Sequence, residues 1–161
     1  NAIAEEAVKR SPTKQLVYFE AAQSSLAQNQ IDRALDFMER AWRLAPQWHV
    51  PAAHAWALAV LAGKPALIAE IENVLTLDDF DESTLVSLSR AYQQVKDFAG
   101  AEEIYAMLAK KHPSNAQYHA TYAALLANNG KAAEARRHAE EAIRLDPAFE
   151  KEAQQFLQTV R

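Results

Sequence analysis

Apolar residues recur along the chain with helical spacing, in segments that short polar stretches separate. In the segment 34–44 the apolar side chains follow one another by three or four positions, which places them on one stripe of a helix. The members of this stripe are Ala34, Phe37, Met38, Ala41 and Leu44. Turn-forming pairs interrupt the pattern at Asn29-Gln30, Gly63-Lys64, Lys96-Asp97 and Gly130-Lys131. The pattern therefore predicts helices that are joined in antiparallel pairs by short turns.

The same kinds of residue recur every 33 or 34 positions. Pro12 and Pro46 are 34 residues apart, as are Pro113 and Pro147, and Asp79 stands where a proline between them is missing. One series is small in every copy: Ala22, Ala55, Ser89 and Ala123. Three further series are mostly apolar: Ala34, Leu67, Ala101 and Ala135; Met38, Ile71, Tyr105 and Ala139; and Ala41, Val74, Leu108 and Ala142. A small residue at a fixed position lets two helices cross closely, so the series predict a packed array of helical repeats.

We expect an all-α solenoid in which each repeat is one antiparallel helix pair closed by a proline. The repeats begin near residues 15, 48, 82 and 116, and they occupy 15–47, 48–81, 82–115 and 116–146. The second repeat is degenerate, with Pro51 in a position that is usually bulky, and its register is open by one residue. Residues 1–14 are expected to be the second helix of a preceding repeat. Residues 147–161 are expected to form a capping helix that covers the last repeat with Phe149, Ala153, Phe156, Leu157 and Val160.

A helix–turn–helix repeat of about 34 residues with these small and bulky positions resembles the tetratricopeptide repeat (TPR). The third copy carries the resemblance most fully, through Leu85, Leu88, Ser89, Tyr92, Ala101, Tyr105, Leu108 and Pro113. The resemblance implies a single TPR domain over 1–161, coiled as a right-handed superhelix. It also implies a concave groove, lined by the first helices of successive repeats, that receives a peptide or a partner helix.

The groove-facing positions that the resemblance implies lie on or next to the first helix of each repeat. They are Phe19, Gln23, Leu26, His49, Trp56, Val86, Arg90, Gln93, Gln117, Ala120 and Ala124. Phe19 and Trp56 are expected to anchor an apolar segment, with Arg90 orienting it. A second interpretation places Trp56 in the core, since a shift of one residue moves it to the small-residue position. Trp42 and Trp48 are expected to pack between the first and second repeats.

Composition narrows the classes of function. The 161 residues are 50% hydrophobic, with a net charge of −4 and no cysteine. These values argue against a disordered chain, against the basic field that binds nucleic acid, and against disulfide or thiol chemistry. The longest apolar run, 55–63, is less than half of the ~20 residues that cross a membrane. The first residue is Asn1, so we expect the chain to be cut from a longer protein.

No arrangement of reactive residues in the sequence predicts catalysis. The glutamate pairs 5–6 and 140–141 are neighbours that diverge by about 100° on a helix, so we interpret them as solvated helix surface. A calcium loop starting at Asp79 fails because its sixth residue is Thr84 rather than glycine, and Asp81 is instead expected to cap the next helix. The five histidines show no metal-ligand spacing, and no Gly-rich phosphate loop or nucleophile elbow is present. We expect a protein without catalytic residues, cofactor or metal.

The sequence therefore favours a non-catalytic scaffold that binds a peptide or protein segment, with self-association left open as a second kind of partnership. We expect neither nucleic-acid binding nor direct membrane insertion, and a soluble protein for which the cytoplasm is favoured over the periplasm. An alternative rests on 17–46 and 112–153, which resemble the C-terminal TPR segments of bacterial O-antigen ligase/polymerase-like membrane glycosyltransferases. In that alternative this chain is a docking or regulatory segment, and the catalytic part of the protein lies elsewhere.

Overall fold

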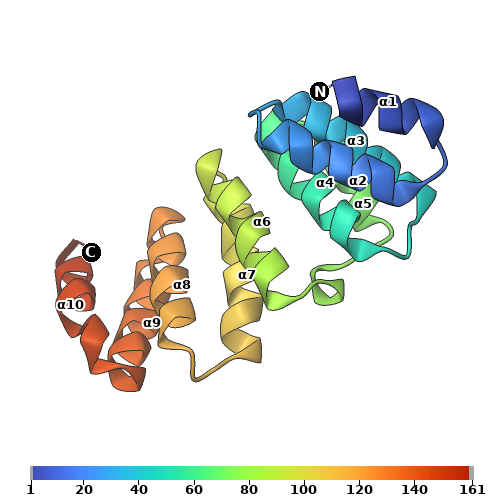
Figure 1. Ribbon diagram of the computed structural model, residues 1–161. Coiled ribbons are helices and arrows are strands. Elements are labelled where there is room, and N and C mark those ends of the chain that lie inside the picture. Colours follow the sequence, from blue (N-terminus) through green and yellow to red (C-terminus); the bar gives the residue numbers. More distant parts are fainter. Residues whose placement is uncertain (1, 160–161) are drawn as a thin grey trace. The chain divides into compact units, whose positions relative to one another are not determined.

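The computed structural model describes residues 2–159, with side chains from residue 5 onward, and over that range it contains helices and no strand (Figure 1). The α-helices are α1 (Ala2–Arg10), α2 (Gln15–Leu26), α3 (Ile31–Leu44), α4 (His49–Ala62), α5 (Pro65–Glu72), α6 (Glu82–Gln94), α7 (Phe98–Lys111), α8 (Ala116–Asn128), α9 (Ala132–Leu145) and α10 (Glu150–Thr159). Two short 3-10 helices, η1 (Leu77–Asp79) and η2 (Pro147–Phe149), precede α6 and α10. None of the helices in the described range is long and apolar enough to cross a membrane.

Each helix pair turns at a residue with a left-handed backbone. The angle φ is 57° at Asn29, 63° at Gly63, 61° at Lys96 and 76° at Gly130, so this conformation recurs with the period of the sequence. In all four turns the following backbone N–H donates to the carbonyl oxygen five residues earlier, at 2.8–3.0 Å. These bonds satisfy carbonyl groups that the end of the first helix leaves open. The four turns that the sequence predicts are confirmed.

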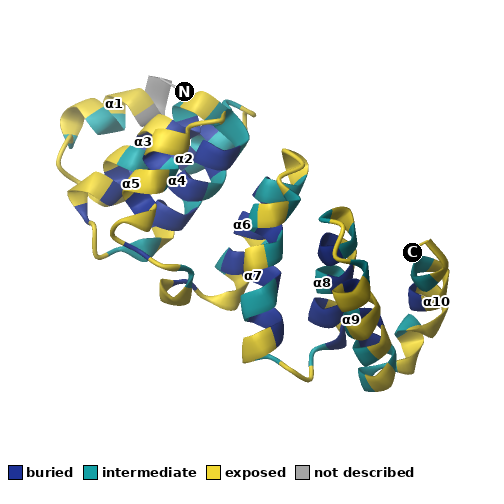
Figure 2. Cartoon of the chain, turned by 180° about the vertical axis from the view of Figure 1, so that it is seen from behind, coloured by how far each residue is buried: buried dark blue, intermediate teal, exposed yellow. Residues whose placement is uncertain are grey.

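Burial follows the same period (Figure 2). Every member of the small-residue series is in the core, the most accessible being Ala123 at 1%. The three apolar series are buried as well, except that Val74 is 61% exposed and Leu75 is buried instead. The reason is the length of α5, which has 8 residues where α3, α7 and α9 have 14, so the chain has left its helical path before residue 74. Leu75 therefore takes the core position of this series, a shift of one residue that the open register of the second repeat allowed.

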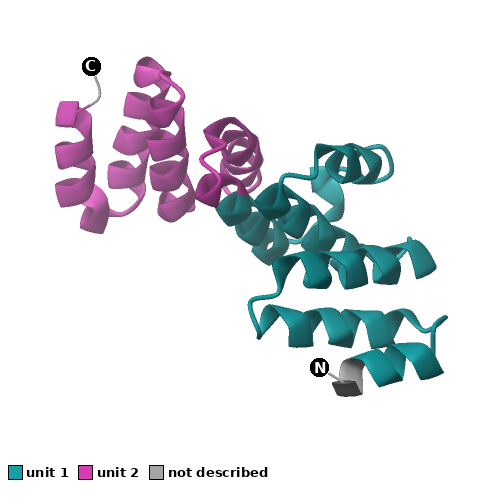
Figure 3. Cartoon of the chain, turned by 90° about the horizontal axis from the view of Figure 1, so that it is seen from above, with its two compact units in different colours: residues 1–91 teal, residues 92–161 magenta. Residues whose placement is uncertain are grey.

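The chain divides into two compact units, residues 1–91 and 92–161, which we call unit 1 and unit 2 (Figure 3). In unit 1, α1 packs on α2, α2 on α3, α3 on α4, and α4 on α5. The side chains of Met38 and Ile71 are fully buried there. In unit 2, α7 packs on α8, α8 on α9, and α9 on α10, around buried side chains such as Leu108 and Leu126. Each unit is thus built of helices that pack on their neighbours in sequence.

Helix α10 packs on the last helix pair of unit 2. Ala153 is buried with Ala123 of α8 and Ala139 of α9, and the half-buried Phe156 contacts the same cluster. Arg136 Nη2 also donates to the Leu157 carbonyl oxygen at 3.2 Å. The apolar face expected for this helix is therefore present, while Val160 lies outside the described residues.

Candidate functional site

In unit 1, helix α2 presents the surface that the sequence assigns to a partner. The buried side of α2 consists of Tyr18, Ala21, Ala22 and Ser25. Phe19, Gln23 and Leu26 lie beside that face and are half-buried. Leu16 lies one turn before Phe19 on the same side of the helix and is 56% exposed. Apolar surface therefore remains accessible along one side of α2.

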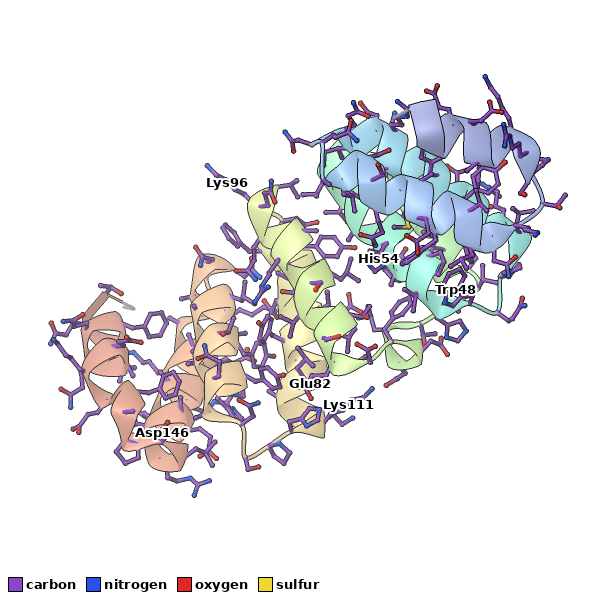
Figure 4. The ribbon with its side chains drawn as sticks, in the orientation of Figure 1. Trp48, His54, Glu82, Lys96, Lys111 and Asp146 are labelled. Atoms are coloured by element: carbon purple, nitrogen blue, oxygen red, sulfur yellow. The ribbon has the colours of Figure 1, made fainter. Side chains whose placement is uncertain are left out.

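Three rings meet where α2 faces the start of α4, and we call Phe19, Trp48 and His54 the aromatic cluster. Figure 4 labels Trp48 and His54 of this cluster. The ring centroid of Phe19 lies 5.0 Å from that of Trp48 and 5.8 Å from that of His54, the second contact being edge to face. His54 Nδ1 lies 2.9 Å from the Val50 carbonyl oxygen. Because a carbonyl oxygen only accepts, Nδ1 carries the hydrogen and donates it. Val50, on the same side of α4 as His54, is 39% exposed, so exposed apolar side chains from both helices flank the cluster.

Trp56 does not belong to this surface. It is only 4% exposed, and its ring meets that of the buried Phe80 edge to face, with centroids 5.9 Å apart. After the short α5, the chain places Phe80 against Trp56, which closes that side of α4. The structure therefore corrects the assignment of Trp56 as an exposed anchor and places it in the core, as the second interpretation had it.

His49 is also turned away from the aromatic cluster. Its Nδ1 lies 3.4 Å from the carbonyl oxygen of Asp79 in η1, to which it donates. The accessible side of α4 is instead formed by residues that are exposed or half-buried: Val50, His54, Ala57 and Leu61. This accessible side includes His54, which the sequence reasoning did not name, and it does not include the buried Trp56.

The remaining predicted positions divide between the two units. In unit 1, Val86 is half-buried and Arg90 is exposed, both on α6. In unit 2, Gln93 is half-buried. The positions on α8 are exposed or half-buried: Gln117, Ala120 and Ala124. The predicted positions therefore occur in both units.

Three of the four first helices carry little or no charge, the exception being α6 with Glu82 and Arg90. Helices α4 and α8 contain no Asp, Glu, Lys or Arg, and α2 contains only Glu20. Helices α3 and α9 contain six such residues each. Some of these charges form ion pairs, as when Arg43 Nη1 and Nη2 donate to the two carboxylate oxygens of Glu70 in α5 at 2.5 and 2.8 Å. This guanidinium lowers the pKa of Glu70 by hydrogen bonding, and Glu70 together with Glu39 raises that of Arg43.

Several of the acidic residues that might suggest chemistry have structural partners. Glu6 pairs with Arg10 at 2.8 Å and Glu141 with Arg144 at 2.6 Å, on the surface of their helices. Asp81 Oδ1 accepts the backbone N–H of Thr84 at 2.8 Å, which confirms it as the cap of α6 and holds its pKa below the usual value. Within the part of the chain that the structure describes, no three His, Asp or Glu residues are grouped so that they could hold a metal ion.

One pair of titratable groups in unit 2 was missed by the sequence reasoning. His119 is 7% exposed, and its Nδ1 lies 2.9 Å from Nδ1 of His138, while its Nε2 donates to the Pro113 carbonyl oxygen at 3.1 Å. With Nε2 carrying a hydrogen, neutral His119 accepts at Nδ1, so His138 donates. Burial, followed by the nearby His119 and Arg137, lowers the pKa of His138.

The period of the repeats could have predicted that His119 and His138 lie close together. A shift of 101 residues takes the starts of α2 and α3 onto the starts of α8 and α9. The same shift takes Tyr18 and Phe37 onto His119 and His138. Because the rings of Tyr18 and Phe37 are also neighbours, with centroids 6.2 Å apart, the two histidines occupy an aromatic contact of the first repeat.

Solved structures with the same helical arrangement come from TPR proteins. The chain is similar to YrrB, described as a TPR protein with an unusual peptide-binding site, with 17% sequence identity, a TM-score of 0.58, and coverage of 89% of this chain and 75% of that one. It is also similar to MamA, with 13% identity, a TM-score of 0.63, and coverage of 91% and 80%. No protein-family model matches the chain, and no curated protein sequence matches it significantly. The chain therefore has the TPR fold.

These comparisons concern the fold alone, since the identities are low. The resemblance of 17–46 and 112–153 to segments of membrane glycosyltransferases is not tested by them and stays a hypothesis.

Proposed function

We propose that this protein is a non-catalytic scaffold that binds a peptide or protein segment on the first-helix surfaces of its repeats. The TPR fold supports the proposal, because it presents one helix of each pair on a preformed surface. The peptide-binding site named for YrrB shows that a protein with this fold can serve such a role.

The observation that carries the proposal is the absence of charged residues from the first helices α4 and α8 and their scarcity on α2. Protein interfaces are depleted of charged residues at their centre, whereas solvated helix surfaces are rich in them. Helices α4 and α8 have no Asp, Glu, Lys or Arg, although both keep accessible side chains. The neighbouring α3 and α9, with six charged residues each, have the composition of solvent-facing helices.

The aromatic cluster gives the surface of unit 1 an anchor. Phe19 and Trp48 are large rings held against each other, so a partner that packs on them orders few side chains on binding. Leu16 and Val50 extend this apolar surface along α2 and α4. We infer that the partner contributes apolar side chains to this surface.

The test is retention of a partner by charge-introducing variants of the full chain. We expect Val50→Asp to reduce the amount of partner captured from a cell extract at least tenfold, because binding would bury the new carboxylate. Val74→Asp is the matched control: it makes the same change at a more exposed valine of unit 1, and it should capture as the unchanged chain does. Equal capture by both variants would refute the proposal.

A further inference from the structure

The first helix pair, α2 and α3, can be compared residue by residue with the last pair, α8 and α9, by the shift of 101 residues. The same shift also relates the helices that follow the two pairs. It takes the start of α4, His49, onto the start of α10, Glu150. Helix α10 therefore follows α9 as α4 follows α3 (Figure 1). Each residue of unit 1 between α2 and α4 thus has an equivalent in unit 2.

In unit 1, the space between the first helix and the one that follows the pair is filled by a ring. Phe19 extends from α2, and its centroid lies 5.8 Å from that of His54 on α4. In unit 2 the shift takes Phe19 onto Ala120 on α8, Trp48 onto Phe149, and His54 onto Gln155 on α10. An alanine thus stands where the first repeat has a phenylalanine.

The space left by this alanine is a cavity of about 160 Å³, which Ala120 and Phe156 both line. Its other walls are alanines of α8, α9 and α10 and the ring of Phe149, with Glu152 as the one charged residue. A buried apolar cavity of about 150 Å³ can bind benzene, which gives the volume that one ring needs. The volume and the chemistry of the walls therefore match one aromatic ring.

The cavity is open on the side of α8 that faces a partner in the proposed function. Ala124 and Glu152, which both line it, are exposed, and Ala120 is half-buried. A side chain can therefore enter from solvent between α8 and α10.

We propose that this cavity binds a single aromatic ring, supplied by a side chain of the partner segment. The proposal rests on the proposed function, which it extends to unit 2. The ring takes the position that Phe19 occupies in the first repeat, so the partner completes in the last repeat a contact that the chain makes for itself in the first.

The experiment uses benzene and N-acetyl-phenylalaninamide as probes with the full chain. Both should shift the alanine methyl NMR signals of Ala120, Ala123 and Ala153. The methyl signals of Ala22 and Ala55, which are fully buried in unit 1, should not change. Absence of any shift with benzene would overturn the site. A shift with benzene but none with the amide would overturn the assignment to a side chain.

Variants at the mouth test the location. Ala120→Phe places the ring of the first repeat into the cavity, so we expect at least a tenfold loss of affinity for both probes. Ala133→Phe adds the same ring at an exposed position of α9 that does not line the cavity, and it should bind as the unchanged chain does. Ala120→Leu is the smaller substitution if the phenylalanine prevents folding, and the same loss is expected. Undiminished probe binding by a folded Ala120 variant would contradict the proposal.

The two proposals can fail separately. If Val50→Asp abolishes capture of the partner but neither probe binds, the scaffold stands and the cavity does not. If the probes bind but Val50→Asp and Val74→Asp capture equally, the proposed function fails, and with it the assignment of the ring to a partner.

Discussion

The left-handed turn at Lys96 predicts that a glycine in its place stabilises the protein. Lys96 has φ of 61°, a conformation that costs a residue with a Cβ about 1 kcal/mol relative to glycine. Gly130 occupies the equivalent position of the next repeat, with φ of 76°. A Cβ built on Gly130 would meet no atom within 4 Å, so Gly130→Ala carries this conformational cost and no steric one. Lys96→Gly should therefore gain about what Gly130→Ala loses.

Urea denaturation followed by circular dichroism measures both changes. With a slope of about 1 kcal/mol per molar urea, Lys96→Gly should raise the midpoint by about 1 M and Gly130→Ala should lower it by about 1 M. Lys110→Gly is the control, because it removes the same side chain within α7, where glycine costs roughly 0.5–1 kcal/mol. A lower midpoint for Lys96→Gly, as for Lys110→Gly, would refute the reasoning.

Three further predictions follow from single contacts. Burial lowers the pKa of His138, so the unfolded state binds more protons than the folded state below about pH 6.5. The free energy of unfolding should therefore fall as the pH drops through that value. His138→Gln should flatten this dependence in urea titrations at pH 5–7. In Gly100→Ala the new Cβ would lie 2.7 Å from ring carbons of Tyr92. The substitution should therefore cost about 1–3 kcal/mol more stability in the unchanged chain than in a Tyr92→Ala background. Equal costs in the two backgrounds of this double-mutant cycle would exclude the contact. Asp81→Ala should lose about 1 kcal/mol of stability because the cap of α6 is lost, whereas Asp81→Asn should keep most of that stability. Equal losses for the two variants in calorimetry would contradict the capping role.

The repeat architecture was predictable because it depends on local rules. The small residue where two helices cross and the turn residue with positive φ must recur once per repeat, so Ser89 and Lys96 could be placed from the period alone. The cap at Asp81 follows from its place before a helix. These features need only the neighbouring helix pair.

The candidate surface was less predictable because it depends on contacts distant in sequence. The period gives α5 the length of the other second helices, yet it ends at Glu72 and lets Phe80 reach Trp56. That contact buries Trp56 and leaves His54 on the accessible side of α4. The cavity at Ala120 likewise depends on where α10 packs, which periodicity does not determine.

The most direct test of the proposed scaffold uses the three tryptophans as reporters. Trp48 is half-buried in the aromatic cluster, whereas Trp42 and Trp56 are each 4% exposed. NMR spectra of the full chain with increasing amounts of the captured partner would follow their indole N–H signals. The account predicts that the Trp48 signal moves while the Trp42 and Trp56 signals stay in place. Saturable binding that leaves Trp48 unchanged would contradict it.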